Sequence, residues 1–247
     1  MEILIYHLEW QVSPMIKKIM VLRQKNKDSE AYYQTFLYEM KSDSDTVATA
    51  LRMLNMQDDL RDIDGKQVEP IKWECSCLQK KCGACAMRIG GRPRLACDAK
   101  LVEFGDVVKI EPLKKFPVVH DLVVNREILY ENLKTLKLWL EKDSNLPEKK
   151  IALAFKASKC IQCGCCLEVC PNFYPKGTFF GMAAIGITTR LLSEISPKER
   201  AQIADLFDRH IYAGCGKSLA CRKICPAGLD IDELLVNTVS MAIWKMK

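Results

Sequence analysis

The chain has 247 residues, of which 49% are hydrophobic and 28% charged, with a formal net charge of +6. These proportions are typical of a globular protein and exclude a disordered or fibrous one. The longest largely apolar run, residues 179–187, is shorter than the roughly 20 residues that span a bilayer, and the N-terminus lacks the features of a secretion signal. We expect a soluble chain, and because its basic residues are dispersed we expect no nucleic acid among its partners.

Up to about residue 115 the sequence predicts short strands and one helix. Residues 17–24 and 32–40 are rich in aromatic and aliphatic side chains and flank a polar turn, which is typical of a β-hairpin. Ser44 or Asp45 is expected to cap the helix that follows. The apolar residues of that helix fall on one side: Val47, Leu51 and Leu54.

A second hairpin is predicted at residues 87–97, where Gly90 and Gly91 can supply the positive φ angles of a tight turn. Residues 107–113 add one more strand. The N-terminal part of the chain is therefore expected to be a small mixed sheet with a helix packed across it.

From about residue 119 onward the sequence predicts helices. Residues 122–143 and 229–247 carry apolar side chains at intervals of three and four residues. Trp139, Trp244 and the methionines are expected to pack in the core. The apolar face expected for the final helix consists of Ile231, Leu234, Leu235, Val239, Ala242 and Ile243.

Thirteen cysteines fall into three groups, at 75–97, 160–170 and 215–225. A secreted disulfide scaffold is usually short and carries a secretion signal, and an odd count would leave one thiol over. Thiolates bound to metal in a reducing cytosol explain the cysteines better.

The second group, CIQCGCCLEVCP, has the spacing C-x2-C-x2-C-x3-C-P of the bacterial ferredoxin run. In this run three cysteines hold one cubane, here Cys160, Cys163 and Cys166. The fourth cysteine, Cys170, is then expected to ligate a different cluster.

The third group, CGKSLACRKICP, lacks one cysteine of the complete run because Ser218 occupies that position. By the same crossing rule, Cys225 completes the cubane of the second group. Cys170, Cys215 and Cys221 remain for the other cluster, and three thiolates indicate a 3Fe-4S centre. The alternative is that Ser218 ligates a fourth iron as an alkoxide, although a hydroxyl is a much poorer ligand at neutral pH.

The first group has the plant-type 2Fe-2S spacing, with Cys77, Cys82 and Cys85 followed at a distance by Cys97. It falls within the predicted sheet region, where such a loop is normally mounted. Two cysteines are left without a ligand role: Cys75 and Cys165.

Small residues between the ligands allow backbone amides to approach cluster sulfurs closely, namely Gly164 in the second group and Gly83 and Ala84 in the first. Pro171 suits the first turn of a helix. A zinc knuckle is the alternative for the second group, but zinc sites normally use two C-x2-C pairs, which this run does not match.

The sequence contains no nucleophile elbow, glycine-rich nucleotide loop or zinc-protease helix. The histidines, His7, His120 and His210, are scattered and are expected to be surface or packing residues. No catalytic residue is therefore predicted. A protein equipped with three iron–sulfur centres passes single electrons between partners.

The order of the three motifs resembles the iron–sulfur subunit of succinate dehydrogenase and fumarate reductase. The resemblance runs from about residue 16 to the end, and residues 111–124 look like the family's connection between two domains. It implies an α+β fold. Residues 1–118 would form a β-grasp plant-type 2Fe-2S ferredoxin domain, and residues 119–247 an all-helical bacterial-ferredoxin-like domain with the 4Fe-4S and 3Fe-4S clusters.

The resemblance also implies partners. An FAD-containing subunit would interconvert succinate and fumarate and exchange electrons with the 2Fe-2S cluster. The 4Fe-4S and 3Fe-4S clusters would carry them to a quinone beside a membrane-anchor subunit. The chain would then lie peripherally on the cytoplasmic side of the inner membrane, held there by its partners.

The segments CLEVCPNFY and CGKSLAC resemble the menaquinone-linked branch of the family more than the ubiquinone-linked one. Ubiquinone-linked members have a tryptophan pair after the Cys-Pro step and a histidine after the first cysteine of the last motif. Phe173, Tyr174 and Gly216 stand at those positions here. Menaquinone, or a quinone held mainly by the anchor subunit, is expected, and packing is the expected role of Tyr174.

Two other interpretations stay open. One is the iron–sulfur subunit of a soluble fumarate reductase with a thiol donor. Such subunits often carry CCG-type repeats in a C-terminal extension, and this chain ends shortly after its last ligand, which favours the membrane-bound form. The other is a zinc-stabilised basic interaction protein.

Overall fold

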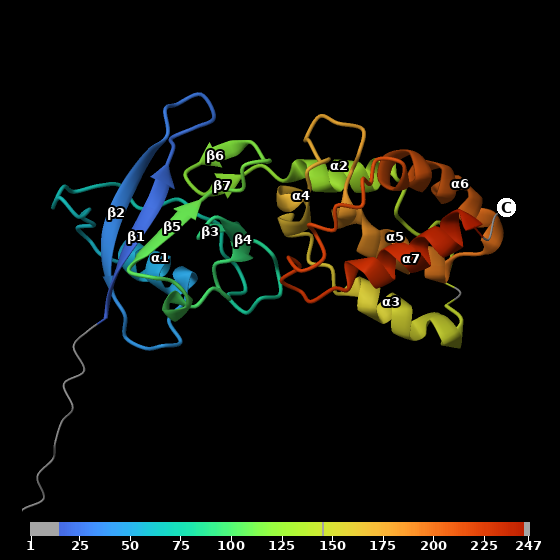
Figure 1. Ribbon diagram of the computed structural model, residues 1–247, viewed down its shortest axis with the longest axis horizontal. Coiled ribbons are helices and arrows are strands. Elements are labelled where there is room, and N and C mark those ends of the chain that lie inside the picture. Colours follow the sequence, from blue (N-terminus) through green and yellow to red (C-terminus); the bar gives the residue numbers. More distant parts are fainter. Residues whose placement is uncertain (1–14, 145, 245–247) are drawn as a thin grey trace, which may run out of the picture.

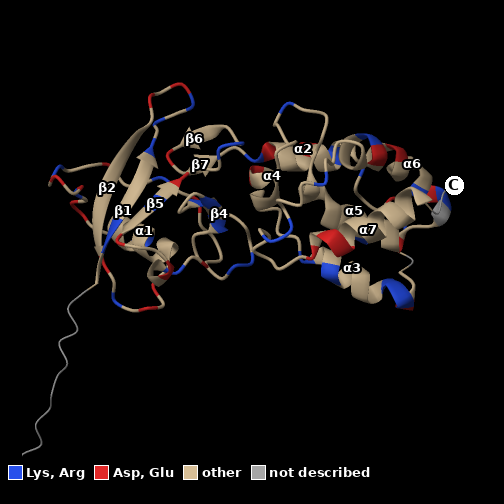
Figure 2. Cartoon of the chain, in the orientation of Figure 1, with Lys and Arg blue, Asp and Glu red and all other residues tan. Residues whose placement is uncertain are grey.

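The computed structural model describes residues 15–144 and 146–244, which form a sheet half and a helical half arranged side by side (Figure 1). The start of the chain, for which the sequence predicts no secretion signal, lies outside the described residues together with His7. Lysine and arginine are dispersed among acidic residues on both halves (Figure 2). Across the described ranges, no helix combines the length and hydropathy needed to cross a membrane.

The sheet half contains a five-stranded sheet in the order β2-β1-β5-β3-β4. β1 is parallel to β5, and the remaining neighbours are antiparallel, so the sheet is mixed as predicted. Alternate side chains of the central strands are buried, as expected where one face of a sheet is packed. The strands are β1 (Ile16–Arg23), β2 (Tyr32–Glu39), β3 (Ala86–Ile89), β4 (Arg92–Leu95) and β5 (Val107–Glu111).

The helix of the sheet half, α1 (Val47–Asn55), buries the apolar face predicted for it. Its N-cap is Thr46, whose hydroxyl accepts a hydrogen bond from the amide of Thr49 at 3.2 Å. The prediction that Ser44 or Asp45 caps the helix was therefore wrong. Asp45 is buried and accepts hydrogen bonds from other groups of the sheet half.

The β3–β4 turn confirms the predicted hairpin, since Gly90 and Gly91 have φ angles of 57° and 80°. A two-residue turn of this kind needs positive φ at both positions, which glycine adopts without steric cost. A short 3₁₀ helix, η1 (Leu101–Glu103), follows before β5.

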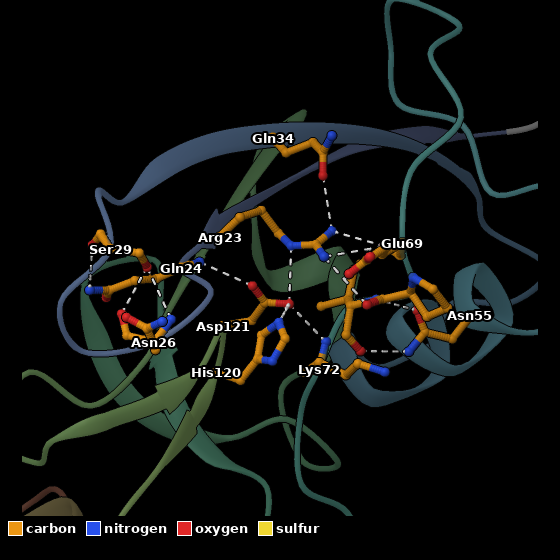
Figure 3. Close-up of polar contacts among 12 residues, drawn as sticks. Arg23, Gln24, Asn26, Ser29, Gln34, Asn55, Glu69, Lys72, His120 and Asp121 are labelled. Atoms are coloured by element: carbon orange, nitrogen blue, oxygen red, sulfur yellow. Dashed lines mark hydrogen bonds and ion pairs between the residues drawn. The ribbon is translucent and has the colours of Figure 1, made fainter.

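Residues 118–124 form a two-stranded hairpin, β6 (Val118–His120) and β7 (Val123–Val124), so the prediction of helix from about 119 onward was wrong here. The hairpin is attached to the sheet half through Asp121. This buried carboxylate accepts hydrogen bonds from the amides of Gln24 and Lys72, both at 3.0 Å, and forms an ion pair with Arg23 at 3.1 Å (Figure 3).

The helical half contains short helices joined by long connections. Of the helix predicted over residues 122–143, only α2 forms, and Lys137, with a φ of 53°, lies in the left-handed region just beyond its end. The helices are α2 (Glu127–Thr135), α3 (Ile151–Ser158), α4 (Cys165–Val169), α5 (Ile185–Glu194), α6 (Pro197–Phe207) and α7 (Ile231–Ala242), with the shorter helical segments η2 (Glu148–Lys150), η3 (Met182–Ala184) and η4 (Asp208–Tyr212).

The final helix confirms its predicted apolar face, which is buried or partly buried along α7. It packs against α5, where the hydroxyls of Thr189 and Thr238 lie 2.6 Å apart. The tryptophan prediction was wrong, because Trp139 and Trp244 are 51% and 65% exposed. The prediction that methionines pack in the core is confirmed for the buried Met40, Met87, Met182 and Met241. It was wrong for Met15, Met53 and Met56, which are exposed.

The two halves are joined by the buried carboxylate of Glu168 in α4. It accepts hydrogen bonds from the backbone amides of Lys114 and Lys115, both at 3.0 Å, and from the Arg88 guanidinium at 3.1 Å. The Lys115 ammonium in turn donates to the carbonyl groups of Cys170 and Phe173. The segment after β5 is therefore fixed to the first turns of the helical half.

Candidate iron–sulfur cluster sites

The β3–β4 hairpin brings together two cysteines that are distant in sequence. Cys85 directly precedes β3 and Cys97 follows β4, and the amide of Ala96 donates to the carbonyl of Cys85 at 3.0 Å. The two thiols are hydrogen-bonded to each other. Burial of Cys85 raises its pKa to about 12. Two of the four cysteines in the plant-type spacing therefore lie together at the base of one hairpin.

The loop before β3 directs backbone amides at sulfur atoms. The amides of Gln79 and Lys81 both donate to the Cys77 thiol at 3.3 Å, and the amide of Lys80 donates to the Cys97 thiol at 3.3 Å. These amides lower the pKa of Cys77 to about 7, chiefly through Gln79. The loop is therefore arranged to stabilise a thiolate before any metal binds.

Left-handed residues give this loop its curvature. Leu78, Lys80 and Gly83 have φ angles of 52°, 62° and 76°. Successive backbone amides in turns of this kind form a concave nest that binds anions. The Cys82 thiol is hydrogen-bonded to Cys77, so the four predicted ligands of the first group lie around one loop and one hairpin.

The second predicted ligand set lines a single cavity in the helical half. Desolvation raises the pKa of the partly buried Cys166, and the charges of Cys163, Cys160 and Cys225 raise it further, so all four thiols lie within electrostatic reach of one another. The structure thus brings the distant Cys225 to the run at 160–166. The cavity is lined by Cys160, Cys163, Cys166 and Cys225 and by the apolar side chains of Met182, Ile185, Leu229 and Ile231.

One polar side chain at this cavity was not found from the sequence. Gln162, with a φ of 49°, donates from Nε2 to the Cys160 thiol at 3.1 Å and to the Ala183 carbonyl at 2.8 Å. Gly164 has a φ of 83°, and a Cβ there would lie 2.9 Å from the Phe116 ring, so the structure shows a packing reason for this glycine. Only a close backbone approach permits this packing.

A second cavity contains the third predicted set. Its walls include Cys170, Cys215, Cys221 and Ser218, together with Asn172 and Phe179. Burial, followed by the charges of Cys170 and Cys215, raises the pKa of Cys221 to about 11. Ser218 therefore stands beside three thiols in the place where a fourth cysteine would complete the set.

The second and third sites are adjacent. Met182 and Ile231 line both cavities, and the charge of Cys221 contributes to the raised pKa of Cys166. In the described part of the chain, no three His, Cys, Asp or Glu side chains converge closely enough for a single metal ion. Cluster ligands bind different irons and so need not converge on one point.

The two cysteines without a predicted role differ in environment. Cys75 is exposed on the loop before the first site. Cys165 is buried in α4 and is hydrogen-bonded to Cys163, which raises the pKa of Cys165 and lowers that of Cys163 to about 7. Pro171 lies in a turn after α4, so the prediction that it begins a helix was wrong.

The remaining predicted residues lie away from the thiols or at the surface. The His210 ring stacks on Phe180 with centroids 4.3 Å apart, and its Nδ1 is 2.8 Å from the Thr178 carbonyl oxygen, so it is a packing residue. The Nε2 atom of His120 lies 3.9 Å from the Oδ2 atom of Asp121. Tyr174 is 64% exposed, contrary to its expected packing role.

Comparison with known proteins identifies a 2Fe-2S domain and a 4Fe-4S domain in this chain. The family model described as "2Fe-2S iron-sulfur cluster binding domain" matches residues 18–131, and that described as "4Fe-4S dicluster domain" matches residues 156–229. The succinate dehydrogenase iron–sulfur subunit of Bacillus subtilis is 31% identical over 227 residues, which cover 87% of each chain.

This chain belongs to the family of succinate dehydrogenase and fumarate reductase iron–sulfur subunits. A fumarate reductase iron–sulfur subunit of Escherichia coli is 28% identical over 222 residues, covering 86% of this chain and 87% of the relative. As an iron–sulfur subunit of this family, the chain is part of an oxidoreductase, as the resemblance of its motifs implied.

The fold of this iron–sulfur subunit is also found in a solved structure. A chain of the Mycobacterium smegmatis Sdh1 complex in the apo form superposes with a TM-score of 0.73 and 23% identity, over 95% of this subunit and 99% of that chain. The mixed sheet, the helices and the two matched domains together confirm an α+β fold.

Proposed function

We propose that this iron–sulfur subunit relays single electrons between a flavoprotein that interconverts succinate and fumarate and a quinone at a membrane. Its relatives are iron–sulfur subunits of succinate dehydrogenase and of fumarate reductase, which supports the dicarboxylate pair. An FAD-containing subunit would be the partner for dicarboxylate chemistry, and a membrane-anchor subunit would hold the quinone. The chain would lie peripherally on the cytoplasmic side of the inner membrane.

The ligand sets that we propose are those indicated by the spacing. The 2Fe-2S cluster is assigned to Cys77, Cys82, Cys85 and Cys97. The 4Fe-4S cluster is assigned to Cys160, Cys163, Cys166 and Cys225. The 3Fe-4S cluster is assigned to Cys170, Cys215 and Cys221.

The observation that carries the proposal is the grouping of the thiols in the folded chain. Each set gathers around one loop or cavity, and the second and third cavities share two side chains in their walls. Amides of Gln79 and Lys81 at the first site, and the amide side chain of Gln162 at the second, are aimed at sulfur. Bound clusters supply acceptance and release of one electron at a time, which couples two-electron flavin chemistry to quinone chemistry.

The third centre is proposed to contain three irons because Ser218 replaces the fourth thiol. At the same cavity, a Cβ on Gly216 would lie 2.7 Å from the Asn172 side chain, so this wall is formed by backbone.

The exposed Tyr174 ring, with the Lys115 ammonium 5.4 Å from its centroid, lies close in sequence to Cys170. We propose menaquinone as the quinone that approaches this side, held mainly by the anchor subunit.

The two domains that we propose are the β-grasp ferredoxin domain at 1–118 and the helical bacterial-ferredoxin-like domain at 119–247. The boundary falls within the β6–β7 region, so this hairpin serves as the connection. Asp121 attaches the hairpin to the sheet half, and Glu168 attaches the helical half to residues 114–115, just before the hairpin.

The test is anaerobic purification of the subunit with its partners, followed by metal and sulfide analysis. The three proposed clusters together contain about nine irons per chain. Electron paramagnetic resonance at stepped potentials is expected to show three distinct signals, one of them from an oxidised three-iron centre. Colourless protein that contains only zinc would refute the relay and support the zinc-stabilised alternative.

A further inference from the structure

The loop that carries the first ligand set touches the loop that carries the second. At Gly83, between Cys82 and Cys85, an added Cβ would lie 2.8 Å from the carbonyl oxygen of Ile161 and 2.9 Å from the Cβ of Cys163. Both distances are shorter than real Cβ contacts, and the atoms concerned are not the ends of flexible side chains. The two ligand loops therefore meet backbone to backbone, with no room for a side chain between them.

Arg126, the residue before α2, holds this contact closed. Its guanidinium donates to the carbonyl of Gly83 at 2.9 Å and to that of Ala84 at 2.6 Å. It also pairs with Glu74 at 2.6 Å, and the Arg126 side chain is 12% exposed. Because Arg126 leads into the helical half, it fastens the first ligand loop to that half directly at the contact.

The Arg126 charge reaches the second ligand set as well. The carbonyl of Gly83 accepts a hydrogen bond from the Arg126 guanidinium, and Gly83 itself lies against Cys163, so the guanidinium is close to the second ligand loop. Glu74 offsets part of this charge, but its side chain is 43% exposed and therefore better screened by water. A positive charge consequently lies between the two sets of thiolates.

We propose that electrons cross between the first and second clusters at the Gly83 contact, and that Arg126 is the positioning residue that keeps the contact closed. This inference rests on the proposed ligand sets. One electron leaves the reduced centre and arrives at the oxidised one, and no bond or proton changes at the contact. Reduction adds negative charge, so the nearby guanidinium raises the midpoint potential of both centres.

The first test compares two glycine variants in the intact complex. Gly83→Ala has to separate the loops, whereas Gly65→Ala carries the same backbone strain, with a φ of 77°, and meets nothing within 4 Å. Transfer between the first and second centres, followed by rapid-freeze electron paramagnetic resonance, is expected to slow several-fold in Gly83→Ala only. The magnetic interaction between the two centres is expected to weaken in the same variant.

The second test separates position from charge. Arg126→Gln is expected to shift both midpoint potentials to more negative values and to slow transfer. Arg126→Lys keeps the charge but cannot bridge two carbonyl groups in the same way, so the potentials should largely return while transfer stays slow. Arg61→Gln removes an exposed charge paired with Asp59, away from the contact, and is expected to change neither.

The outcomes distinguish this inference from the relay itself. If metal analysis shows the clusters in place and Gly83→Ala behaves like Gly65→Ala, the crossing point lies elsewhere and the inference is refuted. Potentials that do not change in Arg126→Gln would refute its electrostatic role. Absence of the first two centres from the unmutated complex would instead refute the proposed function.

Discussion

In the sheet half, Cys85 and Cys97 lie at the base of a hydrogen-bonded hairpin, whereas Cys215 and Cys221 in the helical half lie in a stretch of turns and irregular backbone. In the sheet half, apolar side chains are buried between the strands and α1, and Cys85 is one of these buried residues. In the helical half the thiols form the walls of cavities. The comparison indicates that the first site is attached to a domain with its own apolar core. The thiols of the other two sites, in contrast, make up part of the packing of the helical half.

The largest expected effect is the response to removal of iron. Because a metal site that fills part of a core contributes its binding free energy to folding, chelation under reducing conditions should unfold the helical half. The sheet half should keep its strands, since Ile19, Val21 and Phe36 are buried among other apolar side chains of that half. Amide hydrogen exchange, mapped by half, measures the difference. Equal loss of protection in both halves would contradict the comparison.

A smaller but qualitative change is expected at the third site. Ser218→Cys supplies the missing thiol in a cavity already lined by Cys170, Cys215 and Cys221. The oxidised three-iron signal should diminish and a four-iron signal should appear, as measured by electron paramagnetic resonance. Ser158→Cys, on an exposed helix end, is the matched control and should leave the signals unchanged. Two cubanes in the unmutated protein would show that Ser218 already ligates iron.

The contact between the halves predicts an intermediate effect. Glu168→Gln places an amide NH₂ group against one of three donors, so the free energy of opening at this contact should fall by about 3 kcal/mol. The exchange of the Lys114 and Lys115 amides, which bond to the carboxylate, should accelerate about 100-fold. Glu131→Gln, on an exposed pair with Lys134, should have little effect.

The smallest predicted effect concerns the cap of α1. Thr46→Ala removes the hydroxyl that accepts from the Thr49 amide and should lower the stability of the sheet half by about 1 kcal/mol. Ser44→Ala should change it much less, because the Ser44 hydroxyl bonds to the Ser42 hydroxyl at the exposed surface. Urea denaturation, monitored by a spectroscopic signal from the sheet half, measures the stability of both variants. A larger loss of stability for Ser44→Ala would instead support the prediction that Ser44 caps the helix.

The sequence was sufficient where the determining pattern is local. The glycine pair at 90 and 91 and the apolar face of α7 depend on neighbours a few residues away, and the structure places both as expected. The assignment of Cys225 to the second site spans a longer distance. It followed from a rule about ferredoxin runs, which carries three-dimensional information that periodicity does not.

The failures lie where tertiary contacts decide. Residues 118–124 read as helix because apolar residues recur along them, but the bonds from Asp121 to the sheet half make them a hairpin. Trp139 and Trp244 are apolar in composition and exposed in the fold. Arg126 and Glu168 could not be found at all, because their partners lie about 43 and 54 positions away and no motif links them.

The wall formed by Met182 and Ile231 limits how the two inner centres can be modified. Each of these side chains lines both cavities, so a replacement there alters the surroundings of two proposed clusters at once. Residues that line one cavity alone, such as Gln162 in the first and Asn172 in the second, allow either site to be adjusted independently. To change the properties of one site alone, substitutions should therefore begin at the side chains of Gln162 and Asn172 and leave Met182 and Ile231 unchanged.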